Sequence, residues 1–371
     1  MITDGFTMTP SRLPAWNGAG AVPNAAFIID LHRRRLPGPA VAAGCRLTDE
    51  DGSVRIDFDM LGGAILLGHA HPVIEAAVVE TVPTAREAAS ALSAMLPDHP
   101  ATAFCAEESQ ALPAAVAVAR RVSGRRRVAV WQPGDGVFDG AIDLAALLVD
   151  PLGMSPAQLK AARQAADDCG ALLIFDEGVS GFRIHPQGAQ GLGLVQPDLS
   201  VFGASIANGR PIGALAGHRS LISQLDPDDL PPPRQDSLAA AFATLKVLQT
   251  SPVAAELQIL GAQLQAEVEA LIARAGAGRL FSLAGDPCLP TPLFSSPVLE
   301  GLWMREMRAR DLIVAGPHAL SAAHGEAEIS ALVAAYAHLL PAMMARSMAQ
   351  LLQRPLPPQD LFYSVAPEGR A

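Results

Sequence analysis

The sequence contains almost no lysine. Only Lys160 and Lys246 are present, although Lys and Arg together number 27 of the 371 residues. Asp and Glu number 37, so the formal net charge is -10 at pH 7. This surplus of negative charge opposes binding to a phosphate backbone, and nucleic acid is therefore not an expected partner. The shortage of lysine also leaves few candidates for any chemistry that needs a side-chain amine.

Long apolar runs are absent too. The most apolar window, residues 61–79, is interrupted by His69, His71, Pro72 and Glu75. Because a membrane-spanning helix needs about 18 or more predominantly apolar residues, no membrane span is expected. The first residues show no basic region followed by an apolar run, which predicts a cytoplasmic location without a secretory signal.

The cysteines offer no bridging or metal-binding pattern. Cys45, Cys105, Cys169 and Cys288 lie far apart and form no C-x-x-C pair. In a reducing compartment such cysteines are expected to be free thiols, so neither a disulfide nor a zinc site is predicted.

Local patterns predict several elements. An Asp-Gly pair between alternating segments predicts a β-hairpin over residues 45–58. Ser155, followed by proline and then Gln158, predicts the start of a helix that ends at Gly170. The apolar run that follows and stops at Asp176 is typical of a buried parallel strand whose carboxyl end opens on a site.

The same kinds of pattern organise the rest of the chain. Apolar spacing predicts helices over about 25–35, 71–82, 109–122, 237–250, 253–275 and 326–341, and strands over about 128–131, 197–203 and 211–217. With 50% hydrophobic residues, the chain can bury a sizeable core in one large domain or two interlocked ones. We expect an N-terminal arm with a small-domain hairpin over 1–59, a large domain over 60–240, a small C-terminal domain over 241–345 and a loose tail over 346–371.

Three segments in this order resemble the class III, fold-type I, pyridoxal-phosphate (PLP) aminotransferases, and among them the glutamate-1-semialdehyde aminomutases. They are residues 44–58, the Leu-Gly-His-Ala-His-Pro segment 67–72, and the Leu-Leu-Ile-Phe-Asp-Glu-Gly-Val-Ser-Gly-Phe-Arg segment 172–183. A weaker fourth is residues 320–324. The resemblance covers roughly residues 40 to 345. It implies an α/β fold with a mostly parallel seven-stranded sheet in a large domain, a small α/β domain built from both termini, and a homodimer with sites at the interface.

The resemblance also implies roles for individual residues. In the family, a lysine forms a Schiff base with PLP, an aspartate holds the pyridinium nitrogen, and backbone amides hold the phosphate. Asp176 matches the pyridinium partner, and Phe138 matches the aromatic residue that stacks on the ring. Ser109 keeps one hydroxyl of the phosphate turn.

Other family positions are changed. Ala204 matches the position of the Schiff-base lysine, and Gly178 replaces the valine that covers the ring. The phosphate turn Ser-Gly-Thr-Glu-Ala reads Glu107-Glu108-Ser109-Gln110-Ala111, which places two carboxylates at a helix N-terminus. The turn by which the second subunit grips the phosphate is shortened to residues 234–237, and most of a family segment is missing between residues 140 and 147.

Each candidate also has a structural interpretation. Asp176 could cap a neighbouring helix or pair with Arg183. Phe138 could be a core residue. The histidines His69 and His71 match a structural turn of the family. Glu107 and Glu108 would supply charge to their helix or form a site for a cation or an amine.

The leading hypothesis is an aminotransferase-like protein that has lost covalent PLP chemistry and serves as a non-catalytic partner or regulatory subunit. It would form a homodimer, or a heterodimer with an intact relative. The alternative is an enzyme that holds PLP or pyridoxamine phosphate (PMP) without a covalent link, or that runs a cofactor-free reaction in the same pocket. A third hypothesis is a binding module for a cationic or amine metabolite.

Overall fold

The computed structural model describes residues 2–3, 41–80, 82–131, 143–192 and 195–352. Its centre is a seven-stranded sheet in the order β1-β6-β7-β8-β9-β10-β5. The pairs β6–β7, β7–β8 and β8–β9 are parallel, whereas β9–β10, β10–β5 and β1–β6 are antiparallel. Strands β5 to β9 therefore run in one direction, and the expected mostly parallel sheet is confirmed. The bounds of the strands are Ile2–Thr3 (β1), Ala101–Cys105 (β5), Arg127–Val130 (β6), Leu144–Val149 (β7), Leu172–Glu177 (β8), Leu199–Phe202 (β9) and Gly213–Gly217 (β10).

Helices cover both faces of this sheet. Helix α4 (Glu108–Ser123) packs its alanines and valines on one face, against residues such as Leu148 and Val201. On the other face, α5 (Pro156–Cys169) covers β7 and β8, and α3 (Ala85–Met95) and α7 (Gln235–Thr250) cover the end near β5 and β10. In α/β proteins with a parallel sheet, ligand sites form at the carboxyl ends of the strands.

Helix α5 forms as its sequence predicts. The Ser155 side chain accepts a hydrogen bond from the backbone N–H of Gln158, and proline occupies the first helical position. Gly170 ends the helix at φ 58°, in the left-handed region that glycine adopts without strain. Strand β8 begins two residues later, at Leu172. The N-cap of α5 and the glycine that ends it therefore determine where β8 lies, and with it the last two residues of β8, Asp176 and Glu177.

The hairpin also forms, and it joins distant parts of the chain. Strands β3 (Arg46–Thr48) and β4 (Val54–Asp57) pair antiparallel, and β2 (Val41–Ala43) pairs with β3. Strand β13 (Leu312–Ile313) adds to β4 in parallel, so this four-stranded sheet combines early and late residues. A two-stranded sheet of β11 (Phe281–Ala284) and β12 (Thr291–Phe294) lies in the later part.

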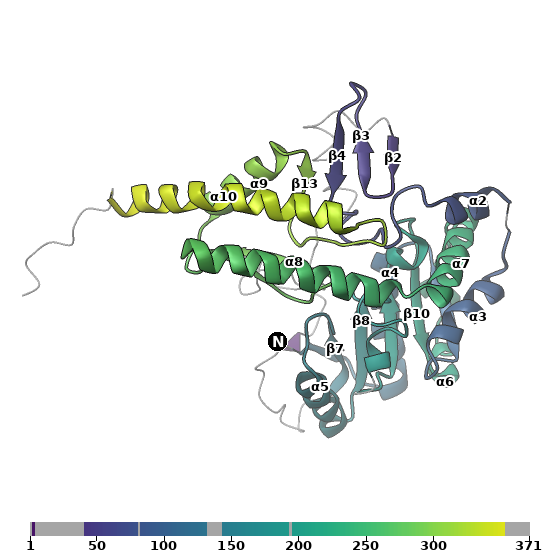
Figure 1. Cartoon of the computed structure of the whole chain (residues 1–371). Coiled ribbons are helices and arrows are strands. Elements are labelled where there is room, and N and C mark those ends of the chain that lie inside the picture. The colour runs from purple at the N-terminus through teal and green to yellow at the C-terminus, as the bar shows by residue number, and fades with distance from the viewer. Residues whose placement is uncertain (1, 4–40, 81, 132–142, 193–194, 353–371) are drawn as a thin grey trace, which may run out of the picture.

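Two long helices complete the chain. Helix α8 (Val253–Ala275) and helix α10 (Glu326–Leu352) pack side by side and extend away from the large sheet (Figure 1). Helix α9 (Pro297–Arg308) packs against α10. The sequence predicts an end near Pro341, but α10 continues through this exposed proline. Buried Leu339, Leu340 and Met343 hold that turn against the core.

Helix α10 is long and apolar enough to span a membrane by length and composition. The same holds for α7 and α8 only if they are joined across their 73° bend. In α10, however, 44% of the apolar window is buried inside the protein, where it packs on α8 and α9. The buried face of α10 includes Ile329, Leu332, Tyr336 and Leu339, which belong to the apolar core.

Five elements of the large sheet region were not expected from the sequence: strands β1, β5 and β7, helix α3 and the short helix α6 (Arg219–Ile222). Helix α2 (Pro72–Glu80) and the expected helices and strands from α4 onward do form. The helix expected over residues 25–35 lies outside the described residues.

Candidate functional site

The carboxyl ends of β7, β8 and β9 meet at one edge of the sheet. Asp176 is the fifth residue of β8 and pairs in register with Val201 of β9. Asp150 follows β7 directly, and Ala204 follows β9 after a single glycine. Parallel pairing therefore brings Asp150, Asp176 and Ala204 to the same edge, where α/β proteins bind ligands.

Ala204 opens the short 3-10 helix η2 (Ala204–Ala207). This places a methyl group, not an amine, at the end of β9. The two lysines of the chain lie elsewhere: Lys160 is on α5 and Lys246 on α7, and both are exposed. The Lys246 ammonium lies 5.6 Å from the ring centre of Phe242 on the same helix.

Glu108, the first residue of α4, reaches across this edge. Its carboxylate Oε2 accepts a hydrogen bond of 3.2 Å from the backbone N–H of Ala204. Glu108 thus joins the N-terminus of α4 to the N-terminus of η2. Both termini present backbone N–H groups that attract an anion.

Two glycines make room for this carboxylate. A Cβ built on Gly203 would lie 2.6 Å from Glu108 Oε1 and closer still to its Cδ and Oε2. A Cβ built on Gly178 would lie 2.7 Å from Glu108 Oε1 and 3.3 Å from Asp176 Oδ1. The Glu108 carboxylate therefore occupies the space that a side chain at position 178 or 203 would need.

The edge is strongly acidic. Burial raises the pKa of Asp150 to about 6, and burial together with the charge of Asp150 raises that of Asp176 to about 7. Burial raises the pKa of the fully buried Glu177 to about 8, and partial burial of its carboxylate also raises the pKa of Glu108, although that residue is exposed overall. Among the described residues, no lysine or arginine pairs with any of these four carboxylates. The raised pKa values mean that these crowded carboxyl groups hold protons to a higher pH than free carboxyl groups do.

Asp176 does not pair with Arg183. Its Oδ1 accepts the backbone N–H of Gly178 at 3.2 Å. Arg183 is fully buried and donates to the backbone carbonyls of Leu320 and Gly63, the latter at 2.6 Å. The structural alternative of an Asp176–Arg183 ion pair is thus wrong, and Arg183 instead ties β8 to the C-terminal part of the chain.

The other sequence candidates are dispersed. Ser109 is the second residue of α4 and is exposed. Phe138 lies outside the described residues. Arg234, in the segment that replaces the family's phosphate-gripping turn, pairs with Asp236 at 3.0 Å on the surface.

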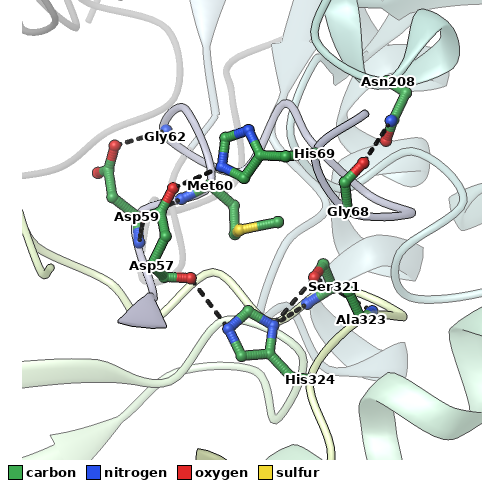
Figure 2. Close-up of polar contacts among 10 residues, drawn as sticks. All are labelled: Asp57, Asp59, Met60, Gly62, Gly68, His69, Asn208, Ser321, Ala323 and His324. Carbon is green, nitrogen blue, oxygen red and sulfur yellow. Dashed lines mark hydrogen bonds and ion pairs between the residues drawn. The ribbon is translucent and has the colours of Figure 1, made fainter. Parts of the chain in front are cut away.

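His69, in the Gly-His-Ala-His-Pro turn, belongs to a hydrogen-bond network away from Asp176. His69 Nε2 lies 2.8 Å from Asp57 Oδ2, and the Asp57 carbonyl contacts buried His324 Nε2 at 2.9 Å (Figure 2). Asn208, just after η2, accepts from the backbone N–H groups of Leu66 and Leu67 and donates to the Gly68 carbonyl. This network joins the hairpin to the segment after Ala204.

The sequence did not identify Asp150 as a residue of this site, nor the contact between the Glu108 carboxylate and Ala204. Asp150 carries the same signal as Asp176, since it ends the apolar run of β7. No local signal reveals the contact of Glu108 with Ala204, because 96 residues separate them.

No family model matches the chain. The sequence is 25% identical over 300 residues to glutamate-1-semialdehyde 2,1-aminomutase of Methylacidiphilum infernorum, covering 62% of this chain and 69% of that protein. It is 27% identical over 377 residues to the protein of the same name from Desulfitobacterium hafniense, covering 78% of this chain and 87% of that protein. A solved transaminase with PLP bound superposes with a TM-score of 0.71 at 24% identity, covering 87% of this chain and 98% of the transaminase. The chain therefore has the fold of the fold-type I PLP transaminases.

Proposed function

We propose that this chain is an aminotransferase-like protein that forms no covalent link to PLP and acts as a non-catalytic partner or regulatory subunit. The observation that carries the proposal is Ala204 at the carboxyl end of β9, beside Asp176. A Schiff base needs an uncharged amine within reach of the cofactor aldehyde. Neither Lys160 nor Lys246 supplies one there, because both are exposed on helices that cover the sheet.

The residues at the carboxyl ends of β8 and β9 also do not fit the cofactor. When bound, PLP supplies an electron sink for carbanions formed at the substrate carbon. Asp176 suits the pyridinium nitrogen of such a ring. The Glu108 carboxylate, however, already accepts the backbone N–H of Ala204 and occupies the space before Gly178 and Gly203. A phosphate at about 4 Å from this carboxylate would be repelled by roughly 1 to 4 kcal/mol per charge pair. We therefore assign no chemical step to PLP in this chain.

A role as a partner agrees with the surface around α2. Helix α2 is apolar, but Ile74 is its only buried residue. Val79 on this helix is 84% exposed, and Val82, two residues after its end, is 78% exposed. A hollow of about 520 Å³ adjoins them, lined by Val78, Val79, Val82, Arg234, Gln235 and Asp236. The carboxylates described above, Glu108, Asp150, Asp176 and Glu177, do not line this hollow. Exposed apolar faces rimmed by polar groups are typical of protein interfaces, and we propose that a second chain of the same fold covers this one.

The test is a titration of the purified protein with PLP and PMP, followed by absorbance and melting temperature. The Ala204→Lys variant is titrated in parallel, because it restores the side-chain amine of the lysine position and changes no other residue. We expect no saturable binding by the natural protein and no internal Schiff-base absorbance. Saturable binding of either cofactor by the natural protein would refute the proposal and favour an enzyme that works with a non-covalent cofactor.

A further inference from the structure

We infer that the Glu108 carboxylate is an internal substitute for a bound anion at the carboxyl end of β9, and that it keeps phosphate groups out of this position. The inference rests on the proposed function, because it concerns the same pocket. It goes further by assigning the exclusion of anions to one side chain.

The first argument is the contact itself. The carboxyl ends of parallel strands, where helices begin, are the usual positions for phosphate in α/β folds. Here Glu108, the first residue of α4, places its carboxylate at the carboxyl end of β9, with Oε2 3.2 Å from Ala204 N. A carboxylate bonded to a backbone N–H at a helix start does what a bound phosphate oxygen would do.

The second argument is the space around it. Gly203 and Gly178 come from two different strands' ends, and a side chain on either would collide with the Glu108 carboxylate. Neither glycine has a positive φ, so neither is required by its backbone conformation. Their small size instead fits the inserted carboxylate.

The third argument is electrostatic. Asp176 and Asp150 lie at the same edge, and no basic residue of the described chain neutralises them. Glu108 adds a further carboxylate close enough to Asp176 to raise its pKa. An incoming phosphate would have to displace it and accept the repulsion of the remaining acids.

The experiment measures binding of inorganic phosphate, and then of PLP, by calorimetry at neutral pH. The variants are Glu108→Ala, which removes charge and bulk, and Glu108→Gln, which removes charge alone. Glu107→Gln is the matched control, because it removes one charge from the same turn without contacting Ala204. We expect Glu108→Ala to bind phosphate at least about tenfold more tightly than the natural protein, and Glu107→Gln to behave like the natural protein.

A second measurement keeps the inference testable if the anion affinities are too weak to compare. Gly203→Ala is made in the natural and the Glu108→Ala backgrounds, with Gly316→Ala as control, since a Cβ on Gly316 meets nothing within 4 Å. In the natural background the new methyl expels the carboxylate from Ala204 N. The loss in melting temperature should therefore be at least about 3 °C larger there than in the Glu108→Ala background.

The outcomes separate the two proposals. Binding of PLP by the natural protein overturns the proposed function. If the natural protein binds no PLP, and Glu108→Ala gains no phosphate affinity while Gly203→Ala costs the same in both backgrounds, the role of Glu108 is overturned and the proposed function stands. Equal gains for Glu107→Gln and Glu108→Ala would show a diffuse charge effect and would also overturn the inference.

Discussion

Replacing Asp176 by asparagine should make the protein more stable at alkaline pH. Burial raises the pKa of Asp176 to about 7, whereas an aspartate in an unfolded chain has a pKa of about 3.9. Between these values the unfolded chain has released the proton and the folded chain has kept it. The free energy of unfolding therefore falls as the pH rises from about 4 to about 7, and then levels off.

The size of the effect follows from the shift. About three pKa units correspond to about 4 kcal/mol between the two protonation states. Asp176 is only partly buried, and part of the shift comes from the charges of Asp150 and Glu108, so an effective contribution of roughly 2 kcal/mol is expected above pH 7. Asparagine has a similar shape, carries no charge and retains an oxygen that accepts the backbone N–H of Gly178.

Urea denaturation at pH 4.5 and pH 8 measures this difference. We expect similar midpoints for the natural protein and Asp176→Asn at pH 4.5, and a higher midpoint for the variant at pH 8. A variant that is less stable than the natural protein at pH 8 would refute the reasoning, because it would mean that a cation stabilises the charged form of Asp176.

Two further predictions concern other parts of the molecule. Asn208→Ala removes the side chain that bonds Leu66, Leu67 and Gly68 and places alanine at φ 50°; a loss of about 2 to 4 kcal/mol is expected in urea denaturation, and a loss below about 1 kcal/mol would contradict the importance of this network. Val79→Asp should convert a dimer to a monomer in size-exclusion chromatography with light scattering, whereas the exposed Val122 on α4, changed to Asp, should not; a natural protein that is strictly monomeric would contradict the proposed interface.

Several elements follow from local sequence patterns alone. The capped helix before β8, the hairpin and the acid at the end of β8 all follow from a few neighbouring residues. Helix α3 was missed even though Thr84 and Glu87 form its capping box, a signal that was present. Strand β7 was also missed, although its apolar run, which stops before Asp150, is the same signal that predicted β8.

The character of the site depends on contacts that no local pattern contains. The resemblance to the family identified Ala204 as the residue at the lysine position. It did not show that the Glu108 carboxylate, from helix α4, would lie against the backbone N–H of Ala204. Gly178 appeared to be a loss of a ring-covering side chain. In the structure it is one of two glycines that accommodate a carboxylate.

The central claim is that the chain's own carboxylate occupies the position of a cofactor anion. A crystal structure of the natural protein grown with saturating PLP tests it most directly. The account predicts Glu108 Oε2 within hydrogen-bond distance of Ala204 N and no cofactor density between Asp176 and Gly203. Density for PLP against Asp176, with Glu108 turned out of the pocket, would contradict it.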